Sequence, residues 1–247
     1  MMTDTRTTRT NPMDGNVIAT MFNWNGKGSR KMQLANKVLG AMNSKMQLKH
    51  PCQYGEMTTR EMRMNLFHLL SSNLIFNVPG DVCDLGCFNG QTTVLLKKII
   101  EHYNPQVQLH AYDSFYSALG EKDAKQAFVD SFKKYNIAMP HLHEGDFYKT
   151  IPAQLPDSIC FANIDCGFGG NPDDHKNVIK HLLQHVYPRM STNAVCVLVD
   201  YAETNNPSLW NINKGVKPAC DEFFSDKPEK VQSLFGGDFF QGYFRKL

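Results

Sequence analysis

Short apolar runs that end in an aspartate recur four times along the chain. They are residues 81–84, 108–113, 160–165 and 195–200, which end in Asp84, Asp113, Asp165 and Asp200. Runs of this kind are typical of strands that are buried on both faces, as in a parallel sheet. Because parallel strands end at the same edge of a sheet, the four carboxylates are expected to line the edge where such folds bind ligands. A row of acids suits a ligand that carries hydroxyl groups, an amino group, a positive charge or a metal.

Helical patterns alternate with these strands. Apolar side chains recur at helical spacing over residues 30–43, 91–103 and 175–187. Thr58-Thr-Arg-Glu61 has the form of a capping box and predicts the start of another helix. Alternation of strands and helices predicts an α/β fold, with helices on both faces of a parallel sheet.

The C-terminal segment follows a different pattern. Residues 231–235 and 239–245 flank Gly236-Gly237, which predicts an antiparallel hairpin. Residues 1–16 are polar and are expected to form a disordered arm. We expect residues 17–76 to form an N-terminal helical cap over a bound ligand, and residues 77–247 to form the core domain.

Size and charge narrow the classes of function. The 247 residues, 42% of them hydrophobic, are enough to bury a core. A formal net charge of +2 argues against binding of nucleic acid, which requires a strongly basic face. No segment resembles a membrane span or a secretory signal, so a cytoplasmic protein is expected. The seven cysteines are then expected to be reduced and mostly buried.

A glycine turn follows the first of the four strands. Its sequence, Asp84-Leu-Gly-Cys-Phe-Asn-Gly90, has glycines that allow a tight backbone and close approach of a ligand. The spacing differs from the Gly-x-Gly-x-x-Gly of dinucleotide folds, and no Walker sequence is present. Asp113, at the end of the next strand, could accept hydrogen bonds from both hydroxyls of a ribose. Ribose binding without a pyrophosphate turn indicates S-adenosylmethionine as the cofactor.

The order of the motifs resembles a known family. Met57-Thr-Thr-Arg, the glycine turn, Tyr112-Asp-Ser-Phe115, Ile164-Asp-Cys166 and Val199-Asp-Tyr201 are similar to segments of the macrocin O-methyltransferase family. The similarity runs over residues 54–247. It implies a Rossmann-like class I methyltransferase fold, with a mostly parallel seven-stranded sheet and an antiparallel C-terminal hairpin. It also implies O-methylation, dependent on S-adenosylmethionine, of a hydroxyl on a sugar, a glycan or a glycosylated small molecule.

The resemblance also implies roles for individual residues. The glycine turn would contact the methionine end of the cofactor, Asp113 and Ser114 the ribose, and Gly145-Asp146-Phe147 the adenine. The candidate cofactor-binding residues are Thr58, Asp84, Gly86, Phe88, Asn89, Gly90, Thr92, Asp113, Ser114, Gly145, Asp146, Phe147 and Asp165.

Two acidic positions of the family are absent from this chain. The family has Asp-x-Asp where this chain has Asp165-Cys-Gly167, and Asp-Asp-Tyr where it has Val199-Asp200-Tyr201. A magnesium ion could assist by lowering the pKa of the acceptor hydroxyl. Its candidate ligands are Asp165 and Asp200, with Asp173 or Asp174 as the third. Without a metal, the base would be Asp165 or a histidine, for which His175 at a helix start is the candidate.

The sequence is compatible with several functions. The alternatives to a sugar O-methyltransferase are a methyltransferase for another small molecule and a catalytically inactive binding subunit with the same cofactor fold. A nicotinamide-dependent oxidoreductase is disfavoured by the glycine spacing. The expected partners are a small-molecule or glycan acceptor and a second copy of the chain in a homodimer. Nucleic acid and membranes are not expected partners.

Overall fold

The computed structural model describes residues 18–19, 30–43, 47–48, 58–116, 123–167, 170–202, 213–236 and 239–247. The predicted arm at residues 1–16 and part of the predicted cap lie outside these ranges. The elements in chain order are β1 (Ile18–Ala19), α1 (Arg30–Ala41), β2 (Gln47–Leu48), α2 (Arg60–Ile75), β3 (Asp81–Leu85), α3 (Gln91–Tyr103), β4 (Leu109–Asp113), α4 (Ala124–Tyr135), β5 (His141–Glu144), α5 (Phe147–Thr150), β6 (Ile159–Ile164), α6 (Pro172–Val186), η1 (Tyr187–Arg189), β7 (Met190–Val199), α7 (Val216–Phe223), β8 (Gln232–Gly236) and β9 (Phe239–Arg245).

The main sheet has seven strands in the order β5-β4-β3-β6-β7-β9-β8. The five strands from β5 to β7 run parallel, and β9 pairs antiparallel with both β7 and β8. The predicted parallel sheet and C-terminal hairpin are therefore confirmed. The strand order reverses between β3 and β6, and ligands of open α/β sheets bind outside the carboxyl ends of the strands at such a point.

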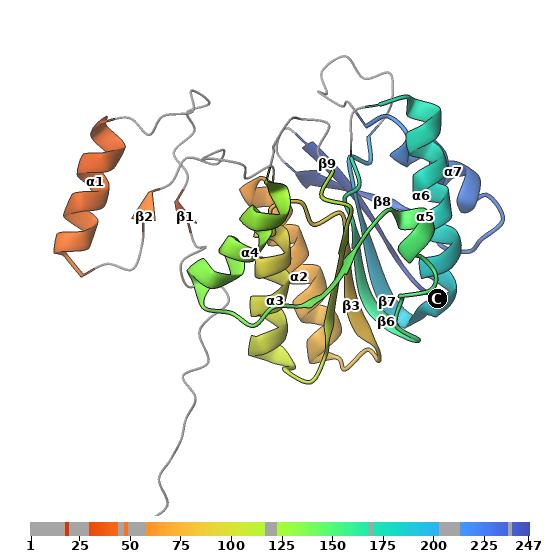
Figure 1. Ribbon diagram of the computed structural model, residues 1–247, viewed down its shortest axis with the longest axis horizontal. Helices are drawn as coiled ribbons and strands as arrows, with labels where there is room; N and C mark the ends of the chain where they lie inside the picture. Colours follow the sequence, from red (N-terminus) through yellow and green to blue (C-terminus); the bar gives the residue numbers. More distant parts are fainter. Residues whose placement is uncertain are drawn as a thin grey trace, which may run out of the picture.

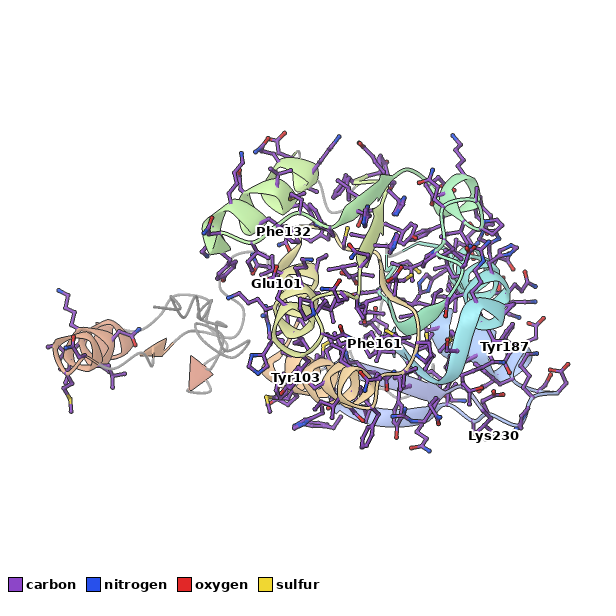
Figure 2. The ribbon with its side chains drawn as sticks, turned by 90° about the horizontal axis from the view of Figure 1, so that it is seen from below. Glu101, Tyr103, Phe132, Phe161, Tyr187 and Lys230 are labelled. Carbon is purple, nitrogen blue, oxygen red and sulfur yellow. The ribbon has the colours of Figure 1, made fainter. Side chains whose placement is uncertain are left out.

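Helices cover both faces of this sheet. Figure 1 shows α2, α3 and α4 on one face and α5, α6 and α7 on the other. Figure 2 shows Phe161 of β6 near the middle of the molecule, with Tyr103 of α3 to one side and Tyr187 of η1 to the other. Phe161 has no exposed surface and packs among the buried side chains of α2 and α3. The sheet is thus the central layer of a three-layer core.

Helix α2 belongs to this core, whereas the sequence placed it in an N-terminal cap. Leu66, Leu70 and Leu74 are at most 2% exposed and pack with the side chains of the central strands. An apolar helix stripe of this width is buried against a sheet because exposing it to water costs free energy. The N-cap is Thr59, whose Oγ1 accepts a hydrogen bond from the Met62 N–H at 3.1 Å. The predicted capping box was therefore wrong by one residue.

Helix α6 begins three residues earlier than its apolar pattern predicted. Its N-cap is Asn171, whose side chain accepts a hydrogen bond from the Asp173 N–H at 2.8 Å, and Pro172 opens the first turn. Asp173 and Asp174 both lie in that turn, where negative charge stabilises the positive end of the helix dipole. Helices α4 and α7 were not predicted.

The cysteines agree with the expectation from composition. The six cysteines in the described part of the chain are free and buried. They lie on or next to the strands of the sheet or in α7, and are Cys83, Cys87, Cys160, Cys166, Cys196 and Cys220. None of the helices among the described residues has both the length and the apolar character needed to cross a bilayer.

Candidate cofactor and active site

Four aspartates gather along one edge of the sheet, as the sequence predicted. Asp84 lies in β3 and Asp113 ends β4, while Asp165 and Asp200 directly follow β6 and β7. Burial raises the pKa of Asp165 well above its usual range, and the charges of Asp200, Asp84 and Asp113 raise it further. Asp165 therefore responds to the charges of the other three aspartates at this edge.

Asp84 is the one member of this row with no exposed surface. Its Oδ2 accepts a hydrogen bond from the Thr93 hydroxyl at 2.6 Å, and its Oδ1 accepts one from the Asn163 amide at 2.9 Å. Burial raises the pKa of Asp84 to about 6, although both of these hydrogen bonds lower it. Asp84 therefore ties β3 to α3 and β6 beneath the ligand edge. The contact with the methionine end that the resemblance implies would need this carboxylate to become accessible.

The glycine turn has the tight backbone that its sequence indicated. Gly86 has a φ of +94°, and a Cβ there would lie 1.9 Å from the carbonyl oxygen of Asp165. Gly90, the N-cap of α3, has a φ of +80°, and a Cβ there would lie 2.9 Å from the ring of Phe128. Between them, Phe88 has a φ of +43°, which is unusual for a bulky residue. The turn therefore brings its backbone close to the β3–β6 crevice and places the N-terminus of α3 directly after it.

Asp113 joins this turn to the end of β4. Its Oδ2 accepts a hydrogen bond from the Phe88 N–H at 2.7 Å, and its Oδ1 accepts one from the Phe115 N–H at 2.6 Å. Burial raises the pKa of Asp113, while the backbone N–H groups of Phe88, Phe115, Cys87 and Ser114 lower it. The half-buried Asp113 side chain is thus fixed in place at the end of β4.

The loop predicted to border the adenine lies next to Asp113. The Gly145 N–H donates to the Asp113 carbonyl oxygen at 2.9 Å, which brings the end of β5 against the end of β4. Asp146 caps α5 by accepting a hydrogen bond from the Tyr148 N–H at 2.8 Å. Phe147 is half-buried against the core. The residues predicted to contact the ribose and those predicted to border the adenine therefore lie next to each other.

The remaining cofactor candidates lie around the turn. The hydroxyls of Thr58 and Thr92 are 3.0 Å apart, which links the residues before α2 to the first turn of α3. Asn89 is buried, and its carbonyl oxygen accepts a hydrogen bond from the Ser131 hydroxyl at 2.8 Å. Ser114 is exposed, and its Oγ accepts from the Tyr116 N–H at 3.3 Å. Asn89 thus supports the turn from beneath, while Ser114 is open to a ligand.

Asp165 and Asp200 follow β6 and β7, so they lie across the β3–β6 crevice from Asp113. Both side chains are half-buried, and burial raises the pKa of each carboxyl. Asp200 has a φ of +61°, a left-handed conformation that is uncommon outside glycine. Its Oδ2 accepts a hydrogen bond from the Asn213 amide at 2.6 Å, which lowers its pKa. The sequence did not single out Asn213, because nothing local links it to a strand end 13 residues earlier.

The three carboxylates predicted to hold magnesium do not come together. Among the residues that the structure describes, no three His, Cys, Asp or Glu side chains are arranged to hold a metal ion. Asp173 and Asp174 are exposed in the first turn of α6, where the helix dipole stabilises their negative charge. The Asp200 oxygen nearest Asn213 faces an N–H donor rather than an open position. The structure therefore does not support Asp165, Asp200 and Asp174 as one ligand set, and a magnesium site at this edge stays a prediction.

His175 lies inside the packing of α6 against the start of α7. It is 3% exposed, and its Nδ1 accepts a hydrogen bond from the Gly215 N–H at 3.2 Å. An Nδ1 that accepts leaves the ring proton on Nε2, so this histidine is the neutral Nε2–H tautomer. Burial lowers its pKa to about 4. A catalytic role for His175 stays a prediction, and the geometry gives it the task of holding α6 to α7.

Comparison with known proteins supports the same fold. No family model and no curated protein sequence matches the chain. Among solved structures, the O-methyltransferase NovP superposes with a TM-score of 0.60 at 17% identity, covering 89% of this chain and 99% of NovP. An O-methyltransferase from Bacillus cereus, solved with S-adenosylhomocysteine, has a TM-score of 0.57 at 11% identity and covers 89% and 92%. A Staphylococcus aureus protein assigned as a caffeoyl-CoA O-methyltransferase has a TM-score of 0.57 at 9% identity and covers 88% and 93%.

These similarities define the class of fold. The chain has the Rossmann-like fold of class I methyltransferases, with the mostly parallel sheet and antiparallel hairpin described above. Identities of 9–17% establish the architecture and leave membership of the macrocin O-methyltransferase family as a hypothesis.

Proposed function

We propose that this protein is an O-methyltransferase that depends on S-adenosylmethionine and methylates a hydroxyl of a sugar, a glycan or a glycosylated small molecule. The observation that carries the proposal is Asp113, held at the end of β4 by the N–H groups of Phe88 and Phe115. A carboxylate in this position, one strand away from the strand order reversal, can accept hydrogen bonds from the two hydroxyls of a ribose. The B. cereus structure, of the same fold, was solved with S-adenosylhomocysteine, the product of that cofactor.

The edge of the sheet offers separate places for the parts of the cofactor. The ribose would lie at Asp113, the adenine beside Gly145 and Phe147, and the methionine end over the glycine turn. Such a placement leaves the sulfonium near the β3–β6 crevice, so that its methyl group faces Asp165 and Asp200. Bound there, S-adenosylmethionine supplies an electrophilic methyl group.

The protein has two tasks in such a reaction. It must hold the acceptor oxygen in line behind the methyl group, and it must take up the hydroxyl proton as the C–O bond forms. Asp165 and Asp200 are the half-buried carboxylates on that side of the site. Their raised pKa values mean that the pair holds a proton more readily than ordinary carboxylates do. The pair is therefore suited to accept the proton that the hydroxyl loses.

The acceptor class follows from the resemblance of the motifs to sugar methyltransferases. A non-sugar acceptor is the alternative, since one protein of the same fold is assigned to caffeoyl-CoA. A binding subunit without activity is the other alternative, because this chain lacks two acids of the family pattern. It would bind the cofactor without transferring its methyl group.

Calorimetry with S-adenosylhomocysteine tests the cofactor site. We expect Asp113→Ala to abolish binding, and Asp130→Ala, an exposed aspartate on α4, to leave the affinity unchanged. An unaltered affinity of Asp113→Ala would remove the basis of the proposal. Screening sugars, nucleotide sugars, glycans and hydroxylated non-sugars with methyl-labelled S-adenosylmethionine then identifies the acceptor class. Binding without transfer to any acceptor would favour the inactive subunit.

A further inference from the structure

One contact connects the residue after Cys166 with a residue near the start of α7. Asn213 is 8% exposed, and its amide Nδ2 donates to Oδ2 of Asp200 at 2.6 Å. A Cβ at Gly167 would lie 2.0 Å from that Nδ2 and 2.7 Å from the Asn213 Cγ. The amide group therefore fills the space that any side chain at position 167 would need.

This contact gives a physical reason for a departure from the family pattern. The resemblance places an acid at position 167, where this chain has glycine. An aspartate there would collide with Asn213 and would place another negative charge beside Asp200. With glycine, the neutral amide reaches Asp200 and donates a hydrogen bond to it. Hydrogen bonds to a charged group are among the stronger ones in proteins, so this contact restricts where the carboxylate points.

The segment that carries Asn213 is itself fixed to α6. Gly215 N–H donates to Nδ1 of His175 at 3.2 Å, and a Cβ at Gly215 would lie 2.4 Å from the Lys176 backbone nitrogen. Residues 213–215 are therefore held against two neighbours, the loop after β6 and the first turns of α6. This anchoring gives the amide a defined position relative to Asp200. It also supports the left-handed backbone of Asp200, whose φ is +61°.

We propose that Asn213 is a positioning residue, which holds the Asp200 carboxylate toward the methyl group to be transferred, and that position 167 is glycine to admit its amide. The inference rests on the proposed function, since it places the sulfonium beside Asp165 and Asp200. Asn213 acts through Asp200 and does not itself touch the cofactor.

The test uses sinefungin, in which an amine-bearing carbon replaces the sulfonium and its methyl group. Its ammonium occupies the place of the transferring methyl and pairs with a carboxylate aimed there, whereas S-adenosylhomocysteine has no group at that place. The ratio of the two dissociation constants, measured by calorimetry, therefore reports whether the Asp200 carboxylate points toward the position of the methyl group. The measurement requires no methyl acceptor. We expect the wild type to bind sinefungin more tightly than S-adenosylhomocysteine, and Asn213→Ala to reduce this preference by about tenfold. The affinity of Asn213→Ala for S-adenosylhomocysteine should stay within about twofold of the wild type.

Two further variants make the result specific. Gly167→Ala should reduce the preference as Asn213→Ala does, because the added Cβ displaces the amide. In an Asp200→Asn background, Asn213→Ala should cause no further loss, since the two residues act as a unit. Asn171→Ala, which removes an exposed asparagine that caps α6, should retain the wild-type preference. A purely structural asparagine would weaken both ligands together, and that result overturns the proposal.

The outcomes separate this inference from the function on which it rests. If the wild type binds neither ligand, the proposed function fails. If it binds both, and Asn213→Ala and Gly167→Ala keep the wild-type preference, the function stands and the role of Asn213 is refuted.

Discussion

The side-chain amide of Asn163 donates to Oδ1 of Asp84 at 2.9 Å, entirely within the protein interior. The two residues are direct partners in the pairing of β3 with β6, the strands between which the order reverses. With the Thr93 hydroxyl on the other carboxylate oxygen, this bond allows a carboxyl group to be buried beneath the ligand edge. Removing either donor would leave Asp84 with an unmet demand for hydrogen bonds.

Asn163→Ala therefore tests the support of the site from beneath. We expect the free energy of unfolding to fall by about 2 kcal/mol, because a buried carboxylate loses one of its two partners. Urea denaturation followed by circular dichroism measures the change. Asn177→Ala, at an exposed position of α6, is the matched control and should change the stability by less than about 0.5 kcal/mol. Equal effects of the two variants would show that the Asn163 bond contributes little.

The glycine turn makes a second prediction. Gly86→Ala should lower the free energy of unfolding by about 3 kcal/mol or prevent folding, because of its positive φ and the lack of space at Asp165. In Gly40→Ala the new methyl group meets nothing within 4 Å, so this variant should be as stable as the wild type or slightly more so. Thermal melting of both variants gives the comparison. A Gly86→Ala variant with wild-type stability would show that the turn relaxes easily.

The buried imidazole of His175 makes stability depend on pH. Its pKa is lowered from 6.5 to about 4, so the folded state takes up this proton less readily than the unfolded chain. The stabilisation is complete above pH 6.5 and is lost progressively as the pH falls from there toward 4. The shift corresponds to about 3 kcal/mol. Burial also lowers the pKa values of His110 and His143, so these residues act in the same direction.

Denaturation of the wild type and of His175→Gln at several pH values checks this prediction. The glutamine cannot take up a proton, so the variant should lose less stability between pH 6.5 and 4 than the wild type does. Nuclear magnetic resonance of the imidazole should show a neutral ring with the proton on Nε2 near pH 6. A ring that titrates at its ordinary pKa would contradict the burial argument.

The placement of Asp174 in the first turn of α6 gives a prediction about magnesium. We expect Mg²⁺ to leave the melting temperature of the wild type unchanged, and Asp174→Asn to respond in the same way. The substitution itself should cost about 0.5 kcal/mol, through the weaker interaction with the helix dipole. A stabilisation by Mg²⁺ that disappears in Asp174→Asn would restore this residue as a ligand.

The sequence predicted the parts of the fold whose apolar pattern is unbroken. The helix over residues 91–103 has the predicted bounds, because its buried stripe begins at the glycine turn and runs to Tyr103. The start of α6 was missed because Asn171 and Pro172 precede its apolar stripe, although together they form an N-cap and a first helical position. Helix α4 was also missed, since only Phe128 and Phe132 mark its buried side strongly.

The candidate site was predictable to a similar extent. Strand ends and a glycine turn are visible in the sequence, so the positions of Asp113, Asp165 and Asp200 could be predicted. The left-handed backbone at Phe88, Phe115 and Asp200 could not, because such conformations are usually marked by glycine or asparagine. Asn213 was missed for another reason: its contact with Asp200 depends on how α7 packs, which no local pattern records.

Because the six described cysteines are buried, the reactivity of their thiols reports local unfolding of the structure around them. A thiol enclosed in the sheet reacts with an alkylating reagent only when the surrounding structure opens, so the labelling rate measures local unfolding. Cys87 lies in the glycine turn, whereas Cys196 lies in the central strand β7. If a bound nucleoside slows alkylation of Cys87 and leaves alkylation of Cys196 unchanged, the ligand lies at the glycine turn. Mass spectrometry of the labelled peptides could follow this without any assay of turnover.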